Sequence, residues 1–131
     1  MYQFKKDMRL CSQKAISELF GTGKGILAYP FSVRYTIAPC EHGEIKILIV
    51  SPKRYQHFSV NRNRAKRLMR EAFRLNKSEL ENIVNTQNIK LHFSVSLVSK
   101  TLPDFAMTNK KMSYILSCIT KQLLADNERN Q

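Results

Sequence analysis

The sequence predicts an α+β fold, a two-layer sandwich in which three helices cover a small mixed sheet of about four strands. Helical and strand periodicities follow one another in the order helix, strands, helix, strand, helix. The chain has 131 residues, of which 43% are hydrophobic and 24% are charged, and this composition suits a globular domain with its own core. We therefore expect one domain over residues 1–131, with flexible ends at residues 1–8 and 126–131.

The first part of the chain predicts a helix and then strands. Ser12 is a suitable N-cap for a helix that runs to about Phe20. The glycine-containing segment 21–25 ends this helix, because glycine commonly follows a helix C-terminus. Apolar and polar residues alternate over residues 31–37, which predicts a strand with one apolar face. Residues 26–29 allow a short additional strand before it.

The middle of the chain predicts a strand followed by a long helix. Residues 45–50 are largely apolar on both sides, so we expect a strand near the centre of the sheet. Pro52 then ends the strand signal. A long helix is expected to begin at Ser59 or Asn61 and to reach Leu75.

The last part of the chain predicts one more strand and a final helix. Alternation over residues 89–97 indicates the strand. Leu102, Pro103 and Asp104 form a loop, and Thr108 is the expected N-cap of the helix that follows. The apolar stripe of this helix consists of Met112, Ile115, Leu116, Ile119 and Leu123.

Positive charge is concentrated in one part of the chain. The 22 Lys and Arg residues outnumber the 10 Asp and Glu residues, which gives a formal net charge of +12. Residues 53–77 contain nine basic residues and one acidic residue, Glu71, so this segment supplies +8 of the total. Such a field favours a polyanionic partner, which could be nucleic acid, an anionic membrane or an acidic protein.

A helical wheel separates residues 62–76 into two faces. The apolar arc, which would face the core, contains Ala65, Leu68, Met69, Ala72 and Leu75. The opposite arc is cationic and contains Arg62, Arg64, Lys66, Arg67, Arg70 and Arg74. Several of these residues are spaced i,i+4 with no acid between them, which destabilises a helix unless a polyanion neutralises it. A merely solvated face usually mixes both signs of charge, so we favour phosphate binding, for which arginine is well suited.

Other partners for a basic helix are less well supported. A membrane-surface helix would carry bulky apolar residues, whereas this apolar arc contains the small Ala65 and Ala72. A helix that reads the DNA major groove needs a supporting helix just upstream, where residues 45–50 predict a strand. No secretory signal is visible, and the apolar run 47–50 is too short to span a bilayer. We therefore expect a cytoplasmic protein with no membrane partner.

No catalytic or metal-binding constellation is evident in the sequence. Cys11, Cys40 and Cys118 are far apart and odd in number, so we expect neither a zinc site nor a disulfide-linked partner. The acidic residues are scattered, whereas a two-metal nuclease needs clustered carboxylates. Segment 21–25 follows a helix and lacks the Ser or Thr of a phosphate loop, so we interpret it as a turn. We expect no catalytic residue and no metal bound by the protein alone.

The segment from Lys53 to Arg74 resembles the signature of the bacterial ribonuclease P protein component. The order of predicted elements is also similar to that family from about Arg9 to Lys121. The matching motifs are Lys53-Arg54, Arg62-Asn63-Arg64, Lys66-Arg67, Leu68-Met69 and Arg70-Glu71-Ala72-Phe73-Arg74.

Three features depart from the family pattern. Ser59 stands where the family usually has Ala, and Ala65 stands where a branched apolar residue is usual. The turn at residues 55–58 is less basic and more aromatic than the common pattern. Neither Ser59 nor Ala65 removes a charge, so we expect RNA binding to survive these two changes.

The resemblance implies both a fold and a function. The fold would be similar to the second domain of ribosomal protein S5, with an unusual left-handed βαβ crossover. The function would be that of the protein subunit of ribonuclease P, which assists a catalytic RNA in removing the 5′ leader from precursor tRNA. The RNA subunit would carry out the chemistry and Mg²⁺ would act through the RNA complex. The implied partners are the ribonuclease P RNA and precursor tRNA; a general RNA-binding or ribosomal-type protein is the alternative.

The resemblance also implies two RNA-binding surfaces. The first joins a basic turn, Lys53 and Arg54, to one side of the long helix. The helix residues of this surface are Arg62, Asn63, Arg64, Lys66, Arg67, Arg70 and Arg74. The second is a leader groove between the first helix and the sheet, where aromatic faces would stack on bases. The residues assigned to it are Ile16, Phe20, Phe31 and Tyr35, and core packing is the alternative for its aromatic members.

Overall fold

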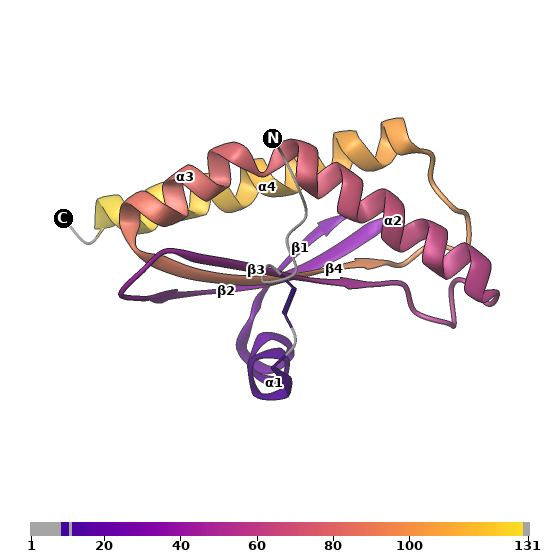
Figure 1. The fold of residues 1–131 in the computed structure, drawn as a ribbon, viewed down its shortest axis with the longest axis horizontal. Coiled ribbons are helices and arrows are strands. Elements are labelled where there is room, and N and C mark those ends of the chain that lie inside the picture. The colour runs from indigo at the N-terminus through magenta and orange to yellow at the C-terminus, as the bar shows by residue number, and fades with distance from the viewer. Residues whose placement is uncertain (1–8, 11, 130–131) are drawn as a thin grey trace.

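Helices cover both faces of a four-stranded sheet in the computed structural model (Figure 1). The structure describes residues 9–10 and 12–129, with side chains as far as residue 125. Helices α2, α3 and α4 lie on one face of the sheet, and α1 lies on the other. The α+β class and the mixed sheet are as predicted, but the described residues form four helices rather than three. Because α1 occupies its own face, it adds a third layer to the predicted two.

The elements alternate much as the periodicities predict. They are α1 (Gln13–Thr22), β1 (Lys24–Ala28), β2 (Phe31–Pro39), β3 (Glu44–Val50), α2 (Ser59–Asn76), α3 (Ser78–Gln87), β4 (Ile89–Leu97) and α4 (Phe105–Arg129). The predicted N-cap of α1 is confirmed, since Ser12 Oγ accepts the backbone N–H of Ala15 at 3.3 Å. A Cβ atom at Gly23 would collide with the carbonyl oxygen of Leu19, so the close turn from α1 into β1 requires glycine.

The sheet has the strand order β1-β2-β4-β3, with β3 and β4 parallel and the other neighbours antiparallel. The parallel pair is joined through α2 and α3, which confirms a βαβ crossover; its left hand stays a prediction. The prediction that residues 45–50 are central is wrong, because β3 is the last strand in this order. The backbone N–H of Leu10 donates to the carbonyl of Ile47 at 3.0 Å on its outer side. An apolar run shows that both faces of a strand are covered but does not report its lateral neighbours.

The register of β2 against β4 decides which side chains enter the core. Phe31 pairs with Leu97 and Val33 pairs with Val95, and all four are buried in the cluster beneath the three-helix layer. Adjacent residues in a strand point to opposite faces, so Arg34 and its even-numbered neighbours point towards the α1 side. The two faces of β2 therefore differ sharply in polarity.

The later helices differ from the predictions at their ends. Asp104, not Thr108, caps α4, because Asp104 Oδ1 accepts the backbone N–H of Met107 at 2.8 Å. Thr108 lies inside the first turn, where its hydroxyl donates to the Asp104 carbonyl. The predicted apolar stripe of α4 is buried as expected. The helix continues to Arg129, beyond its expected end.

Helix α3 was not predicted as a separate element. The helix ends at Gln87, and its C-cap, Asn88, has a left-handed conformation (φ 53°). The expected flexibility of residues 1–8 lies outside the described residues, as does Cys11. Cys40 and Cys118 are free thiols.

Candidate nucleic-acid interface

Helix α2 turns one side to the core and a cationic side outwards. Ala65, Met69, Ala72 and Phe73 are almost completely buried. The outward side, here called the basic face, consists of Arg62, Arg64, Lys66, Arg67, Arg70 and Arg74. The helical wheel is thus confirmed for most of its apolar arc. Leu68 is only half-buried, and Leu75 is the exception at 44% exposed.

The buried side of α2 is rotated towards Phe73, which explains the exposure of Leu75. The rings of Phe73 and Phe93 pack with their centroids 5.7 Å apart. Asn76 lies on the same side and donates from Nδ2 to Asn109 Oδ1 on α4 at 2.7 Å. These contacts with β4 and α4 fix how α2 is turned, and hence where the basic face points.

The cations of the basic face differ in how much the protein itself occupies them. Arg74 pairs with Glu71, with Nε 3.0 Å from Oε2. This hydrogen bond lowers the pKa of Glu71 and raises the pKa of Arg74. Arg62 uses Nη1 to donate to the carbonyl oxygens of Gln56 at 3.1 Å and His57 at 2.8 Å. Arg62 and Arg74 are therefore partly committed within the fold.

The middle of the basic face is not neutralised by the protein. Among the described residues, the side chains of Arg64, Lys66 and Arg67 make no hydrogen bond or ion pair. Burial lowers the pKa of Arg70, and the positive charges of Arg9 and Arg67 lower it further. A bound anion would relieve this repulsion, as expected for a phosphate-binding surface.

The basic turn is joined to the start of α2. Lys53 and Arg54 are exposed, and the Arg54 guanidinium lies over the Tyr55 ring, 5.0 Å from its centroid. Asn63, one turn into the helix, is exposed as well. The structure thus brings the basic turn and the basic face together along one end of α2.

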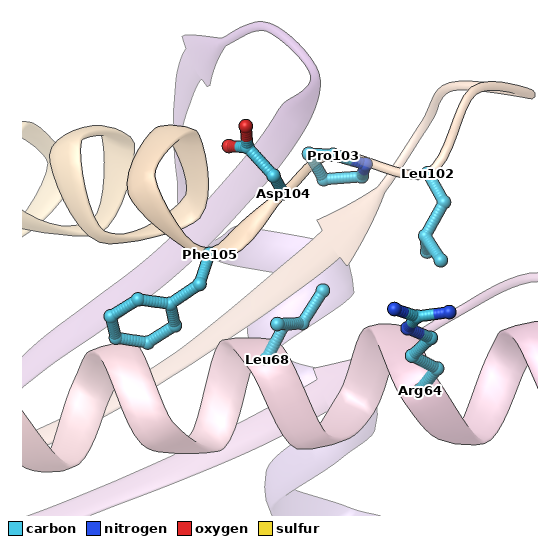
Figure 2. A pocket seen from close by; sticks show the side chains of 6 residues that line it. All are labelled: Arg64, Leu68, Leu102, Pro103, Asp104 and Phe105. Carbon is cyan, nitrogen blue, oxygen red and sulfur yellow. The ribbon is translucent and has the colours of Figure 1, made fainter.

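An open hollow of about 380 Å³ adjoins the basic face, between α2 and the loop that leads into α4. Figure 2 shows Leu68 on α2 between two side chains that reach towards this helix, Phe105 on one side and Leu102 on the other. The Arg64 side chain extends towards Leu102. Arg64 is therefore presented where the basic face meets the α4 loop.

The four residues predicted for the leader groove lie on two different faces of the sheet. Ile16 and Phe20 lie on α1, where Ile16 is half-buried and Phe20 is 44% exposed. Phe31 and Tyr35 belong to the core on the opposite face of the sheet and are 1% and 6% exposed. Placing these two in the groove was wrong, because the pairing of β2 with β4 turns them away from α1.

Polar side chains take the place of these aromatic residues on the α1 side of the sheet. Arg34 Nη1 lies 3.5 Å from the carbonyl oxygen of Phe20, at the end of α1. Ser32 and Thr36 lie on the same face of β2. The sequence interpretation did not include Arg34, because it assigned the groove to the apolar residues of this strand. Arg34 is one of the polar residues that alternate with them.

A hydrogen-bonded pair of side chains, His92 and Glu44, lies at the β3 side of this face. His92 is 7% exposed, and its Nε2 lies 2.9 Å from Glu44 Oε2. Burial tends to raise the pKa of Glu44, but the hydrogen bond with His92 and the charges of Lys46, His92 and Lys90 together hold it below its usual value. His92 therefore packs beside Glu44 and is not open to solvent.

The described residues contain neither a cluster of metal ligands nor a membrane-spanning helix. Among residues 9–10 and 12–129, no three His, Cys, Asp or Glu side chains are grouped so that they could hold a metal ion. None of the helices in the described chain has the length and apolar character needed to cross a bilayer.

Comparisons with known proteins place the chain in a family. The family model described as Ribonuclease P matches residues 4–120. The ribonuclease P protein component of Porphyromonas gingivalis strain ATCC 33277 is 32% identical over 132 residues, covering 99% of this chain and 96% of the relative. The same component of strain W83 matches equally well.

Solved structures share the fold. The Staphylococcus aureus RNase P protein has a TM-score of 0.62 at 19% identity, covering 87% of this chain and 96% of that protein. The Thermotoga maritima RNase P protein has a TM-score of 0.64 at 22% identity, covering 82% and 94%. With the family model and the curated relatives matching nearly the whole length, this chain belongs to the family of ribonuclease P protein components.

Proposed function

We propose that this chain is the protein subunit of ribonuclease P and assists a catalytic RNA in removing the 5′ leader from precursor tRNA. Membership of the family supports a role in tRNA processing. The observation that carries the proposal is the basic face of α2, whose central residues Arg64, Lys66 and Arg67 have no anionic partner among the described residues. These residues fall within the motifs that the family shares.

The basic face would bind phosphates of the ribonuclease P RNA. Guanidinium groups can donate two parallel hydrogen bonds to a phosphate, which gives orientation as well as attraction. Phosphate contacts displace condensed counterions, so binding should weaken steeply as salt rises. Arg62 would act mainly by fixing the turn before α2, because its Nη1 already serves two carbonyl oxygens.

The leader would pass along the α1 side of the sheet. Phe20 offers an exposed ring for a base to stack on, and the Arg34 guanidinium beside it can contact a phosphate. Ile16 on the same helix is apolar but cannot stack as an aromatic ring would. This division assigns the leader and the RNA subunit to opposite sides of the sheet.

The hydrolysis itself would belong to the RNA subunit. Mg²⁺ would act through the RNA complex, as the resemblance to the family implies. The protein's contribution would be positive charge and shape. Such a complex would act in the cytoplasm.

The direct test is cleavage of precursor tRNA by a bacterial ribonuclease P RNA at low magnesium, with and without this protein. The proposal predicts correct 5′ cleavage only when both are present. Tight binding of structured RNA without any effect on cleavage would favour the alternative, a general RNA-binding protein. Cleavage by the protein alone would contradict the assignment of chemistry to RNA.

A further inference from the structure

The turn between β3 and α2 presents aromatic side chains at the surface. We call residues 55–58 the aromatic turn. Phe58 is 67% exposed and His57 is exposed beside it, while Tyr55 is half-buried. Val60, in the first turn of α2, is 75% exposed. Large apolar groups left in water commonly mark a binding surface when they gather at one place.

Hydrogen bonds to Pro52, Ser99 and Arg62 hold the aromatic turn in place. The Pro52 carbonyl accepts the backbone N–H groups of Tyr55 and Gln56, each at 3.1 Å. Gln56 is buried, and its Nε2 donates to the Ser99 carbonyl at 2.8 Å. Arg62 donates to the carbonyl oxygens of Gln56 and His57. A ring presented by so constrained a backbone loses little conformational freedom when a partner binds.

The rings in the turn already make the contacts that a stacking site uses. The Arg54 guanidinium covers the Tyr55 ring at 5.0 Å. The rings of His57 and Phe58 meet edge to face, with centroids 5.2 Å apart and an interplanar angle of 74°. With two-thirds of its surface exposed, Phe58 keeps room for another planar group.

The charge around the turn selects an anionic partner. No Asp or Glu occurs from residue 45 to residue 70, a stretch that includes Lys53, Arg54 and Arg62. The first turn of α2 has no side-chain cap, so the backbone N–H groups of Ser59 and Val60 are open to a phosphate, whereas that of Asn61 donates to the Phe58 carbonyl. A nucleic-acid strand combines a planar π face that can stack on a ring with phosphates that carry negative charge.

We propose that the aromatic turn stacks an unpaired nucleobase of an RNA strand that crosses the start of α2, with Phe58 as the stacking residue and Arg62 as a positioning residue. The proposal rests on the RNA partner of the proposed function. It adds a contact with bases to a surface otherwise described by its charge. The aromatic turn lies between β3 and the start of α2, on other elements than Phe20 in α1.

The test uses Phe58→Trp, because the natural chain contains no Trp and the new indole therefore reports on this position alone. The full chain is titrated with an unstructured RNA strand of about ten nucleotides and with the same strand annealed to its complement. We expect the indole emission to be quenched by the single strand and much less by the duplex. Tyr114→Trp on α4, where Tyr114 is 55% exposed, is the control and should not respond.

Affinity gives the second readout. Phe58→Ala should weaken single-strand binding by about 5- to 150-fold and leave duplex binding within twofold, whereas Phe58→Trp should bind like the natural protein. Equal quenching by strand and duplex, or binding that is unchanged in Phe58→Ala, would overturn the proposal. So would quenching by vesicles of anionic lipid without quenching by RNA, which would indicate a membrane contact.

The outcome is separable from that of the proposed function. If the natural protein restores cleavage but Phe58→Trp is not quenched, the stacking site alone is wrong. If Phe58→Trp is quenched by single strands but the natural protein does not restore cleavage, the ribonuclease P role is wrong and the stacking site stands.

Discussion

Arg67 and Arg74 lie on the same helix face but differ in their surroundings. Arg67 has no anionic partner among the described residues, whereas Arg74 is held by Glu71. We expect Arg67→Ala to weaken binding of ribonuclease P RNA and to reduce the slope of log affinity against log salt by about one for the lost phosphate contact. Arg74→Ala should change the slope less. Equal slopes for Arg67→Ala and the natural protein, measured by titration over a salt series, would exclude a phosphate contact at Arg67.

Phe20 and Phe31 test the corrected faces of the sheet. Phe31 is buried in the core, so Phe31→Ala should lower the free energy of unfolding by about 3–5 kcal/mol. Phe20→Ala should leave stability nearly unchanged and weaken binding of precursor tRNA more than binding of mature tRNA. Denaturant unfolding and substrate titration on both variants check this. A stable Phe31→Ala protein that loses leader binding would restore Phe31 to the groove.

Glu44 links stability to pH through its pairing with His92. The pKa of Glu44 is lowered in the folded protein. The ionised carboxylate therefore stabilises the fold above the usual glutamate pKa, and this stabilisation is lost as the pH falls through the lowered pKa of Glu44. The pair is partly solvated, so we expect Glu44→Gln to cost only about 0.5 kcal/mol near neutral pH. The difference in stability between Glu44→Gln and the natural protein should vanish in acid. Thermal unfolding over a pH series measures this, with the exposed Glu41→Gln as the control; a pH-independent difference would contradict the role of the charge.

At the scale of single elements, α1 ends where two glycines have different surroundings. Gly21 lies within the helix with open space around it, whereas a Cβ at Gly23 would meet the Leu19 carbonyl. We expect Gly21→Ala to stabilise the protein by about 0.5 kcal/mol. Gly23→Ala should destabilise it by about 1–3 kcal/mol. Urea unfolding of the two variants makes the comparison, and similar effects would show that the close turn into β1 is not needed.

The elements also show what the sequence could predict. The start of α2 and its two faces were predictable because charge and apolar spacing agree over many residues. Helix α3 was missed although Leu80, Ile83 and Val84 have helical spacing, because the segment is short and directly follows α2. The face of β2 was assigned wrongly because alternation identifies two faces without saying which one meets which helix. Only the pairing with β4 settles that choice.

At the scale of the whole molecule, the sheet separates two surfaces with different chemistry. Helix α2, which carries the basic face, lies on the three-helix side, and α1, which carries Phe20, lies on the other side (Figure 1). The Arg34 guanidinium lies 3.5 Å from the Phe20 carbonyl oxygen. The family resemblance predicted both surfaces, but composition and periodicity could predict only the first. Charge runs are visible in a sequence, whereas a groove depends on how distant segments meet.

The most direct test of this account uses the complex formed by this protein and ribonuclease P RNA. The quantity measured is the affinity of that complex for precursor tRNA and for mature tRNA of the same sequence. Both are titrated at matched salt and magnesium, with the RNA alone as the reference. The account predicts that the protein tightens binding of the precursor and leaves binding of the mature tRNA nearly unchanged, because only the precursor has a leader. Equal tightening of both would contradict a leader-binding subunit and indicate general attraction between a basic protein and RNA.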